Sequence, residues 1–386
     1  MSELKVAIVH DWLNGMRGGE AVLEAILELF PQSDLFTLVA EPQKVSRTLR
    51  RPKLTTSFLQ KIPGGVSRYR HFLPLMPKAI ESLDLRGYDL VLSSSHCVAK
   101  GVLKDPAAFH AAYVHAPMRY IWDRYEDYFG AGRASLPVRL AAASVRSYLQ
   151  DWDRDSSAPQ RLDHIISNSG FIAERVKEFW RRDSDVVHPF ADLSRFTRER
   201  QPGKNYIMVG AFAPYKRVDL AVEAFNRLKL PLLIVGSGQD EHALKKMAGP
   251  TVDFLGALSN EAITDLLSKA RAFVFPVLED FGITPVEAMA AGCPVIAFGE
   301  GGAAETVTDL SGVFFRPQTV EALMEAVMRI ESGHCVISAE ACRKRAAHFS
   351  KERFQEEYFD SLQRAWEASG RDPKKLPRRD LDSASG

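Results

Sequence analysis

The stretch AFVFPVLEDFGITPVEAMAAGCPVIAF, residues 272–298, decides the fold class of this chain. It begins and ends with a short apolar run, AFVFP at 272–276 and PVIAF at 294–298. Between the two runs lies a helical stretch that stops at Gly292. This order predicts a buried strand, a crossover helix and a second strand parallel to the first. The stretch is therefore typical of an open α/β sheet.

Two carboxylates flank the turn inside this unit. Glu279 lies just beyond the carboxyl end of the first strand, where open α/β sheets bind ligands. Thr284 and Glu287 have the spacing of a capping box, and Pro285 is expected at the first helical position. From these residues alone, Glu287 is either a ligand-binding carboxylate or a helix cap. Glu279 is likewise either a binding residue or a solvated loop residue.

The same alternation of apolar runs and helical patterns extends over nearly all 386 residues. The expected strands are 4–10, 34–39, 88–95, 109–115 and 163–169 in the first half, and 205–210, 230–238, 252–256, 272–276 and 294–298 in the second. A chain of this length exceeds the usual size of one hydrophobic core. We therefore expect two doubly wound α/β domains that face a cleft.

The expected domain boundaries follow changes in composition. A short apolar run gives way to Pro, Gly and charge around 190–204, which places the first domain at 1–192 and the second at 193–350. A helix at 351–370 is expected to pack back on the first domain. Residues 371–386 are rich in charge, Pro, Gly and Ser, and are expected to form a flexible tail.

Composition excludes several classes of protein. The formal net charge of +1 is not that of a polyanion binder, so any electrostatic partner must be recognised by local patches. The four cysteines show neither zinc-ligand spacing nor a disulfide framework, which is typical of a protein in the reducing cytosol. No charged leader precedes the first apolar run, and no run reaches membrane-spanning length. We therefore expect a cytoplasmic protein.

Two acid-free basic segments interrupt the pattern. Residues 42–80 carry nine Lys or Arg residues among bulky apolar ones and contain no Asp or Glu. Residues 133–150 also lack acids and include the amphipathic stretch LPVRLAAASVRSYL. Each segment alone fits an ordinary helix with a basic outer face. Together they favour peripheral contact with an anionic membrane, at the cytoplasmic face of the inner membrane.

Ordered motifs identify a family. VGAFAPYKRVDLAVEAF, LLIVGSG, VDFLGALSNEAI, FPVLEDFGITPVEAMAAGCPVIAFGEGGAAE and DLSGVFF follow one another in the second half. Their order and spacing resemble the retaining glycosyltransferases of family 4, which have the GT-B fold of two Rossmann-like domains. In the first half, KVAIVHDWLNGMRGGEAVLE, YVHAPMRYIWD and IISNSGFIAERV resemble the same family, especially members that build bacterial surface polysaccharides.

The resemblance implies a nucleotide-sugar donor site in the second domain. Glu279 would lie against the hexose hydroxyls, and Glu287 would accept hydrogen bonds from the ribose, because a carboxylate accepts without donating. Lys216 matches the family lysine that stabilises the leaving diphosphate. Without the motif it would be a solvated surface charge. The donor diphosphate would also meet the backbone at a helix N-terminus, and the implied donor-binding residues there and nearby are Gly210, Arg217, Phe281, Gly282, Ile283 and Thr284.

The chain departs from the family pattern at one position. Many relatives have an arginine where Ala211 stands, and that arginine also holds the diphosphate. Arg217 is the neighbouring candidate to supply the missing charge.

The resemblance also implies roles in the first domain. Gly18 and Gly19, at a strand-to-helix turn, would approach the donor diphosphate, and His115 matches a family histidine near the donor sugar. As bare motifs these would be a tight turn and a structural histidine. Three residues that follow His115 are candidates to orient the acceptor: Arg119, Tyr120 and Asp123.

The implied reaction is transfer of a hexose with retention, without metal or cofactor. The PYKRVDLAVEAFNRL and YVHAPMRYIWD stretches resemble mannosyltransferases, which favours GDP-mannose as the donor and a glycan or lipid-linked glycan as the acceptor. No nucleic acid is expected as a partner. Two alternatives remain open, namely a nucleotide-sugar epimerase of the same architecture and a non-catalytic partner subunit.

Overall fold

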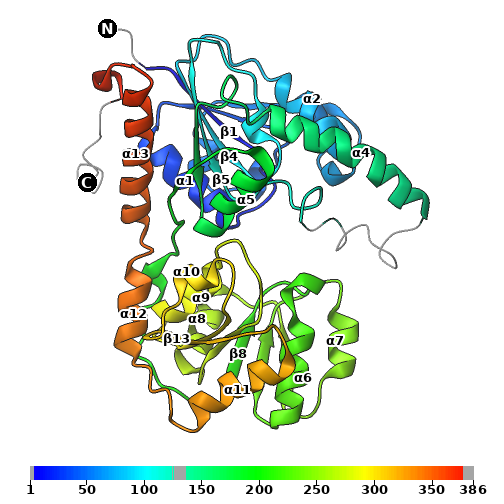
Figure 1. The fold of residues 1–386 in the computed structure, drawn as a ribbon, viewed down its shortest axis with the longest axis vertical. Coiled ribbons are helices and arrows are strands. Elements are labelled where there is room, and N and C mark those ends of the chain that lie inside the picture. The colour runs from blue at the N-terminus through cyan, green and yellow to red at the C-terminus, as the bar shows by residue number, and fades with distance from the viewer. Residues whose placement is uncertain (1–3, 124, 126–135, 377–386) are drawn as a thin grey trace. The chain divides into compact units, whose positions relative to one another are not determined.

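The protein is described by a computed structural model that covers residues 4–123, 125 and 136–376. The chain divides into two compact units (Figure 1). Unit 1 combines Met1–His188 with Phe354–Gly386, and unit 2 is Pro189–Arg353. The boundaries thus lie at 188 rather than the expected 192, and at 353 rather than 350.

Unit 1 is built on a seven-stranded parallel sheet in the order β3-β2-β1-β4-β5-β6-β7. Its strands are β1 (Val6–His10), β2 (Asp34–Thr37), β3 (Leu54–Thr56), β4 (Leu90–Ser95), β5 (Phe109–Val114), β6 (His164–Ser167) and β7 (Asp185–Val186). All residues of β1, β4 and β5 are buried, as expected for strands covered by helices on both faces. The chain leaves β1 for β2 on one side and returns to β4 on the other, so the switch point of the sheet lies between β1 and β4.

Five helices of unit 1 carry labels in Figure 1: α1 (Gly18–Leu29), α2 (Met76–Glu81), α4 (Leu136–Asp155), α5 (Gly170–Trp180) and α13 (Lys351–Ala368). From Phe354 onward α13 belongs to unit 1. Its Gln355 side chain donates to the Ala25 carbonyl of α1 at 3.0 Å, and Phe359 stacks on Phe30. Helix α13 therefore packs against α1.

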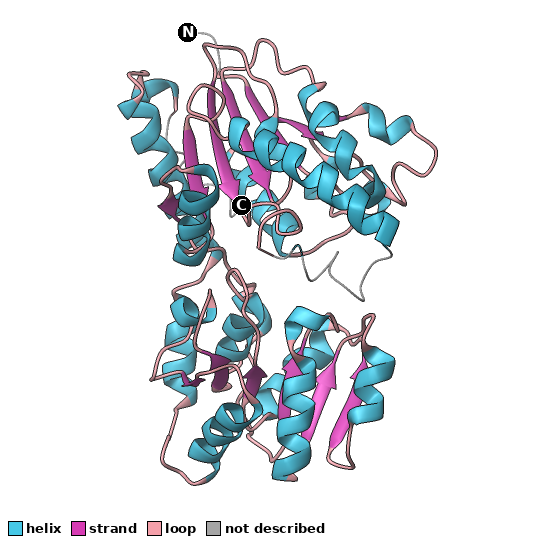
Figure 2. Ribbon diagram, turned by 45° about the vertical axis from the view of Figure 1, so that its right-hand side comes forward, coloured by secondary structure: helices cyan, strands magenta, loops and turns pink. Residues whose placement is uncertain are grey.

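Unit 2 contains a six-stranded parallel sheet in the order β10-β9-β8-β11-β12-β13, shown in magenta in Figure 2. The strands are β8 (Tyr206–Val209), β9 (Leu232–Val235), β10 (Val252–Gly256), β11 (Phe273–Phe275), β12 (Val295–Phe298) and β13 (Gly312–Phe315). The helices are α6 (Val218–Leu228), α7 (Glu241–Met247), α8 (Asn260–Lys269), α9 (Ile283–Ala290), α10 (Ala303–Thr306), α11 (Val320–Glu331) and α12 (Ala339–Ala347). The switch point of this sheet lies between β8 and β11.

The edge strands β3, β7 and β13 were not expected from the sequence. Strand β7 has only two residues, and all three residues of β3 are only half-buried. Edge positions need no long apolar run, because one side of an edge strand has no partner strand and pairing can stop after two or three residues. The hydrophobic signal of β3 and β7 is correspondingly weak.

The basic segment 42–80 does not form one amphipathic surface. It folds into the 3₁₀ turns η1 (Pro42–Lys44), η2 (Thr48–Arg50), η3 (Phe58–Lys61) and η4 (Tyr69–Leu75), with β3 and most of α2. Leu49 and Leu59 are fully buried, whereas Leu75 is 44% exposed. The interleaved apolar residues that we expected at a membrane therefore mainly fill the core. Of the second basic segment, residues 133–135 lie outside the described residues and the rest lie in α4.

The expected flexible tail is wrong for its first six residues. Arg371 donates to the Ala107 carbonyl at 2.8 Å, and its guanidinium lies over the rings of Phe109 and Trp366. Leu376 is buried. Polar composition predicted disorder, but aromatic partners contributed by β5 and α13 order the segment. The remainder of the predicted tail, 377–386, lies outside the described residues.

Candidate functional site

The centre of unit 2 brings two predicted catalytic residues together. Glu279 follows β11 and Lys216 closes the short turn η7 (Pro214–Lys216) after β8, so both lie at the carboxyl edge of the two strands that form the switch point. The Lys216 ammonium forms an ion pair with the Glu279 carboxylate. Each side chain is 18% exposed, so solvent reaches both groups. A cation and an acceptor-only anion thus stand side by side where α/β sheets bind ligands.

The loop that carries Glu279 is supported by two glycines that our sequence analysis did not select. The Gly302 N–H donates to the Glu279 carbonyl at 2.8 Å. A Cβ on Gly302 would lie 2.2 Å from the Phe281 Cα, and a Cβ on Gly301 would lie 2.6 Å from the Glu279 carbonyl oxygen. Only glycine permits this approach. Both glycines belong to the stretch GEGG of the quoted motif. Their contact with the loop that carries Glu279 could not be inferred from the sequence.

Helix α9 begins earlier than predicted. Gly282 is its N-cap with φ of 85°, and the helix runs from Ile283, so Pro285 is the third helical residue rather than the first. No side chain caps this end of α9. The predicted capping box is therefore wrong, because the left-handed glycine lets the chain turn into the helix two residues sooner. The start of α9 leaves backbone N–H groups beside Glu279, which is a suitable environment for an anion.

Glu287 has an ion-pair partner instead of a capping role. Its Oε1 accepts from Arg195 Nη1 at 3.0 Å, and the carboxylate is 18% exposed. Burial raises the pKa of Glu287 and Arg195 opposes that rise, with a net upward shift. Arg195 ends the turn η6 (Leu193–Arg195) and also donates to the Asn260 carbonyl at 3.3 Å. No sequence motif indicated Arg195, which lies 92 residues from Glu287 in the chain.

Arg217 is turned toward partners other than the Lys216–Glu279 pair. It is the N-cap of α6 with a left-handed φ of 51°. Its guanidinium pairs with Asp219 at 3.2 Å and donates to Gln318 Oε1 at 3.2 Å. Gly210 directly follows β8, and its carbonyl oxygen would be 1.9 Å from a Cβ at Gly236, so the loops after β8 and β9 lie in close contact. Whether Arg217 compensates for Ala211 stays a prediction.

Unit 1 gathers polar residues at its own switch point. His10 ends β1, Ser94 lies near the end of β4, and His115 follows β5. His10 Nδ1 lies 3.1 Å from the Ser94 carbonyl oxygen, and Ser94 Oγ lies 2.9 Å from His115 Nε2. A Cβ on Gly19 would be 3.8 Å from both imidazole rings. The structure therefore brings the predicted Gly19 and His115 together and adds His10 and Ser94.

A buried carboxylate, Asp11, organises the turn after β4. Its two oxygens accept from the backbone N–H groups of four consecutive residues, 96–99, at 2.7–3.0 Å. The same carboxylate lies 3.2 Å from His96 Nδ1. His96 is in ring contact with both His10 and His115. Asp11 thereby holds a third imidazole beside the first two, and our sequence analysis selected neither residue.

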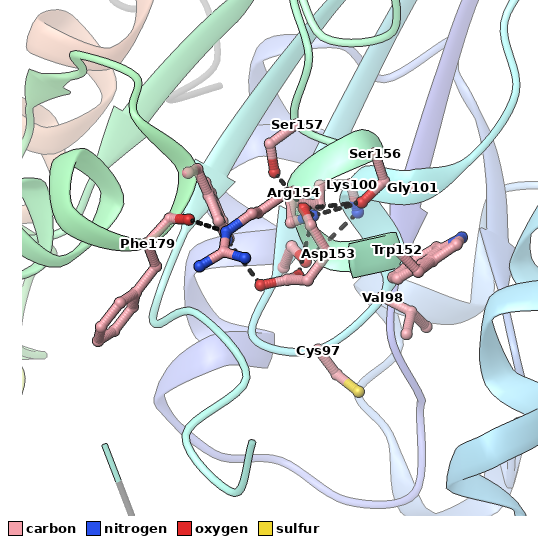
Figure 3. Close-up of polar contacts among 12 residues, drawn as sticks. Cys97, Val98, Lys100, Gly101, Trp152, Asp153, Arg154, Ser156, Ser157 and Phe179 are labelled. Carbon is pink, nitrogen blue, oxygen red and sulfur yellow. Dashed lines mark hydrogen bonds and ion pairs between the residues drawn. The ribbon is translucent and has the colours of Figure 1, made fainter. Parts of the chain in front are cut away.

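Figure 3 shows the buried ion pair that follows this turn. Lys100 Nζ contacts Asp153 Oδ1 at 3.0 Å, the Asp153 carbonyl at 2.8 Å and Ser156 Oγ at 2.6 Å. Lys100 is 1% exposed and the Asp153 side chain is fully buried. Asp153 Oδ2 accepts from the indole N–H groups of Trp122 and Trp180. The pair therefore links the end of α4 to the turn after β4. Through Trp122, Asp153 also contacts the segment that carries the predicted acceptor residues.

Two of the three predicted acceptor residues contact different parts of unit 1. The Tyr120 hydroxyl lies 2.6 Å from Cys97 Sγ, within the interior of unit 1. Asp123 forms an ion pair with Arg175 of α5 at 2.8 Å. Arg119 is half-buried. Their assignment to the acceptor stays a prediction.

The described residues contain neither a group of metal-binding side chains nor a membrane-spanning helix. No group of three or more His, Cys, Asp or Glu side chains in residues 4–123, 125 and 136–376 is arranged to hold a metal ion. No helix in the same part of the chain combines the length and apolarity needed to cross a bilayer.

Comparison with known proteins identifies unit 2. The family model "Glycosyl transferases group 1" matches residues 191–349, nearly the whole of unit 2. Residues 191–349 are therefore a glycosyl transferases group 1 domain.

Two curated relatives share the sequence more widely. Human alpha-1,3/1,6-mannosyltransferase ALG2 is 29% identical over 276 residues, which are 61% of this chain and 65% of that protein. O-antigen chain mannosyltransferase C of Escherichia coli is 30% identical over 217 residues, which are 50% of this chain and 56% of that protein. The matched part of the chain spans less than two thirds of the length of either relative.

A solved structure shows the same fold over both units. The apo form of the lipopolysaccharide outer core galactosyltransferase WaaB matches with a TM-score of 0.66 at 16% identity, covering 93% of this chain and 99% of that one. The prediction of a GT-B fold with two Rossmann-like α/β domains is confirmed.

Proposed function

We propose that the protein is a retaining glycosyltransferase that transfers a hexose, mannose from GDP-mannose, to a glycan or lipid-linked glycan in polysaccharide biosynthesis. The observation that carries the proposal is the Lys216–Glu279 ion pair beside the uncapped start of α9. A nucleotide sugar presents an anionic diphosphate next to neutral hydroxyl groups. The ion pair and the start of α9 together offer a cation, backbone N–H donors and a hydroxyl acceptor.

In this proposal each residue has a chemical task. The diphosphate would bind the N–H groups of Phe281, Gly282, Ile283 and Thr284, and the Lys216 ammonium would exchange part of its contact with Glu279 for a phosphate oxygen. Lys216 then stabilises the charge that develops as the sugar–phosphate bond breaks. Glu279 accepts from hexose hydroxyls, and Glu287, held by Arg195, accepts from the ribose.

The proposed reaction proceeds with retention and without a metal ion. The acceptor hydroxyl oxygen attacks the anomeric carbon on the face from which the diphosphate departs. The bond from that carbon to the phosphate oxygen breaks, its electron pair stays with the diphosphate, and the acceptor proton passes to a phosphate oxygen. Protein charges stabilise the oxocarbenium-like centre meanwhile. Lys216 and the start of α9 supply the positive charge that a metal ion would otherwise contribute.

Mannose is favoured as the transferred sugar because ALG2 and the O-antigen enzyme are both named mannosyltransferases. The O-antigen name also supports a polysaccharide acceptor.

We propose that the enzyme works at the cytoplasmic face of the inner membrane, where exposed Arg47, Arg50 and Arg51 would meet anionic headgroups. Charge-reversal of the three arginines should lower binding to phosphatidylglycerol vesicles, while leaving binding to neutral vesicles unchanged. Equal binding of the wild type and the variant to phosphatidylglycerol vesicles would contradict the proposed membrane contact.

The first test is a thermal-shift panel of nucleoside diphosphates and nucleotide sugars, because a ligand that binds only the folded state raises the melting temperature. Stabilisation by GDP and GDP-mannose, lost in Lys216→Ala, is the expected result. Transfer of mannose to a glycan acceptor, lost in Glu279→Ala, separates a transferase from an epimerase, which needs no acceptor. No stabilisation by any nucleotide would contradict the proposal and favour a non-catalytic partner subunit.

A further inference from the structure

The loop that leads into α9 contains a buried aromatic ring. Phe281 is 3% exposed, and its ring meets that of Phe349 edge to face, with the two centroids 5.5 Å apart and an interplanar angle of 68°. Phe349 lies two residues after the end of α12 and is 2% exposed. Rings in this arrangement attract each other in a defined orientation. The position of Phe281 therefore depends on Phe349.

The backbone of Phe349 is itself fixed by hydrogen bonds. Its N–H donates to the Ala346 carbonyl at 2.9 Å, and its carbonyl accepts from the Ala191 N–H at 3.1 Å. Ala191 follows the first crossing of the chain between the units, and Phe349 precedes the second crossing. Both backbone polar groups of Phe349 are thus satisfied. Its ring therefore projects from a fixed point of the backbone.

One arginine joins Phe349 to α10. Arg345 of α12 places its guanidinium carbon 5.0 Å from the centroid of the Phe349 ring. Its Nε donates to the Thr306 carbonyl at 2.8 Å, and its Nη2 donates to the Glu305 carbonyl. These carbonyls lie at the end of α10, where helix carbonyls lack partners within the helix. A planar guanidinium can lie over a ring and donate to two acceptors at once.

Helix α10 begins directly after the glycine that contacts the backbone of the same loop. The Gly302 N–H donates to the Glu279 carbonyl at 2.8 Å, and a Cβ on Gly302 would lie 2.2 Å from the Phe281 Cα. Phe281 is thus held by its backbone at Gly302 and by its ring at Phe349. Arg345 contacts both supports, because it binds the end of α10 and lies over the Phe349 ring.

The position of Phe281 is important because the next residues begin α9. Gly282 is the N-cap of this helix, and no side chain caps it. The N–H groups at the start of α9 are the proposed donors to the diphosphate. Hydrogen bonds weaken steeply when donor and acceptor are misaligned. Donors that are fixed before the ligand arrives bind it without a further cost in ordering.

We infer that Phe349 and Arg345 are positioning residues for the nucleotide sugar. They fix Phe281 and, through it, orient the N–H groups at the start of α9 toward the diphosphate. The inference rests on the proposed function, which assigns the diphosphate to this loop. Both side chains act through the loop and not through a contact of their own with the ligand.

Phe349→Leu tests the role of the ring, because it removes the aromatic edge and keeps a buried apolar side chain. Loss of one hydrogen bond to a charged group corresponds to about a tenfold change in binding. We expect the variant to bind GDP about tenfold more weakly, and to bind guanosine, which lacks phosphate, like the wild type. The KM for GDP-mannose should rise about tenfold, whereas the KM for the glycan acceptor should not change. An equal loss for GDP and guanosine would overturn the inference.

Two substitutions at Arg345 provide a graded test, which also decides the matter if Phe349→Leu does not fold. Arg345→Met should weaken GDP binding about tenfold, and Arg345→Lys should recover part of the affinity, because an ammonium lacks the planar fork. Matched controls are Phe225→Leu, which removes a ring packed on Tyr206, and Arg271→Met, which removes a donor to a carbonyl at the end of α11. Both controls should leave the affinity for GDP unchanged, whatever their effect on Tm. If they weaken GDP binding equally, the role is only structural and the inference is wrong.

A measurement with inorganic pyrophosphate separates this inference from the proposed function. In ¹⁵N-labelled wild-type protein, pyrophosphate should shift the backbone amide resonances of Gly282 and Thr284. The shifts should be reduced in Phe349→Leu and retained in Phe225→Leu. This pattern without any nucleotide binding would refute the proposed function and support the positioning role. GDP binding of equal strength in the wild type, Phe349→Leu and Arg345→Met would refute the positioning role alone. If neither pyrophosphate nor GDP shifts these resonances in the wild type, the loop binds no diphosphate and the inference is overturned.

Discussion

Replacing Lys100 by methionine should destabilise unit 1 strongly, because it leaves a buried carboxylate without its counter-ion. Lys100 Nζ has three oxygen partners within 3.0 Å, and its ammonium lies 4.4 Å from the centroid of the Trp180 ring. Burial lowers the pKa of Lys100, and Asp153 opposes that shift. Breaking a buried ion pair by removing one partner costs about 3–5 kcal/mol. For a unit of this size the loss corresponds to a fall in Tm on the order of 10 °C.

The chain offers a selective probe for this measurement. All five tryptophans, at positions 12, 122, 152, 180 and 366, belong to unit 1, so the unfolding of unit 1 can be followed by tryptophan fluorescence in urea. Three of these rings, Trp122, Trp152 and Trp180, contact the ion pair itself. The free energy of unfolding obtained in this way belongs to the unit that carries the substitution.

A double variant tests the cause of the loss. In Lys100→Met with Asp153→Asn neither of the two positions carries a charge, and the asparagine oxygen can still accept from the indole N–H groups. We expect this protein to be clearly more stable than Lys100→Met alone. Arg86→Ala is the matched control, since its partner Asp84 is 57% exposed and exposed pairs contribute little. A Lys100→Met loss below about 1 kcal/mol, or no recovery in the double variant, would refute the reasoning.

Three further predictions follow from the two units. Glu287→Ala should weaken nucleoside diphosphate binding while the fold is retained, because Arg195 loses its partner at the proposed ribose site; unchanged affinity in a titration would exclude that site. Gly302→Ala should abolish nucleotide-dependent thermal stabilisation, since a Cβ 2.2 Å from Phe281 Cα must displace the loop, and a normal thermal shift would show that the loop adapts. His110 has its pKa lowered to about 4 by burial, so the unfolded state binds a proton that the folded state excludes, and stability is lost as pH falls from 6.5 toward 4. The loss should be about 3 kcal/mol smaller in His110→Gln than in the wild type, as measured by urea unfolding at both ends of this range; a parallel pH dependence in the two proteins would contradict it.

The strands of the central sheet regions could be predicted because their signal is local. Strands covered by helices on both faces need uninterrupted apolar runs, and the runs around β1, β4, β5, β8 and β12 met that need. The start of α9 was predicted wrongly because the sequence favours two different caps. The sequence is compatible with a capping box at Thr284 and with a left-handed N-cap at Gly282. In the structure Gly282 has the left-handed conformation, so the helix begins after it.

Motif spacing also placed several proposed site residues after the strands where the structure has them, but it gave no information on their partners. Lys216 and Glu279 each follow a predicted strand, yet their contact depends on β8 and β11 being neighbours in the sheet, which the order of strands along the chain does not require. Arg195 and His10 had no distinguishing pattern. Arg195 lies in a polar linker, and His10 is one residue of an apolar strand.

The sequence by itself determined the class of fold, the glycosyl transferases group 1 motifs and the residues that stand at strand ends. These features depend on contiguous residues, through periodicity, turn chemistry and spacing. Only the tertiary structure decided which groups meet: Glu287 with Arg195, Lys100 with Asp153, and His10 with Ser94. Crossover connections bring segments that are far apart in the sequence next to one another, and a side chain takes its partner from whichever segment is adjacent in space.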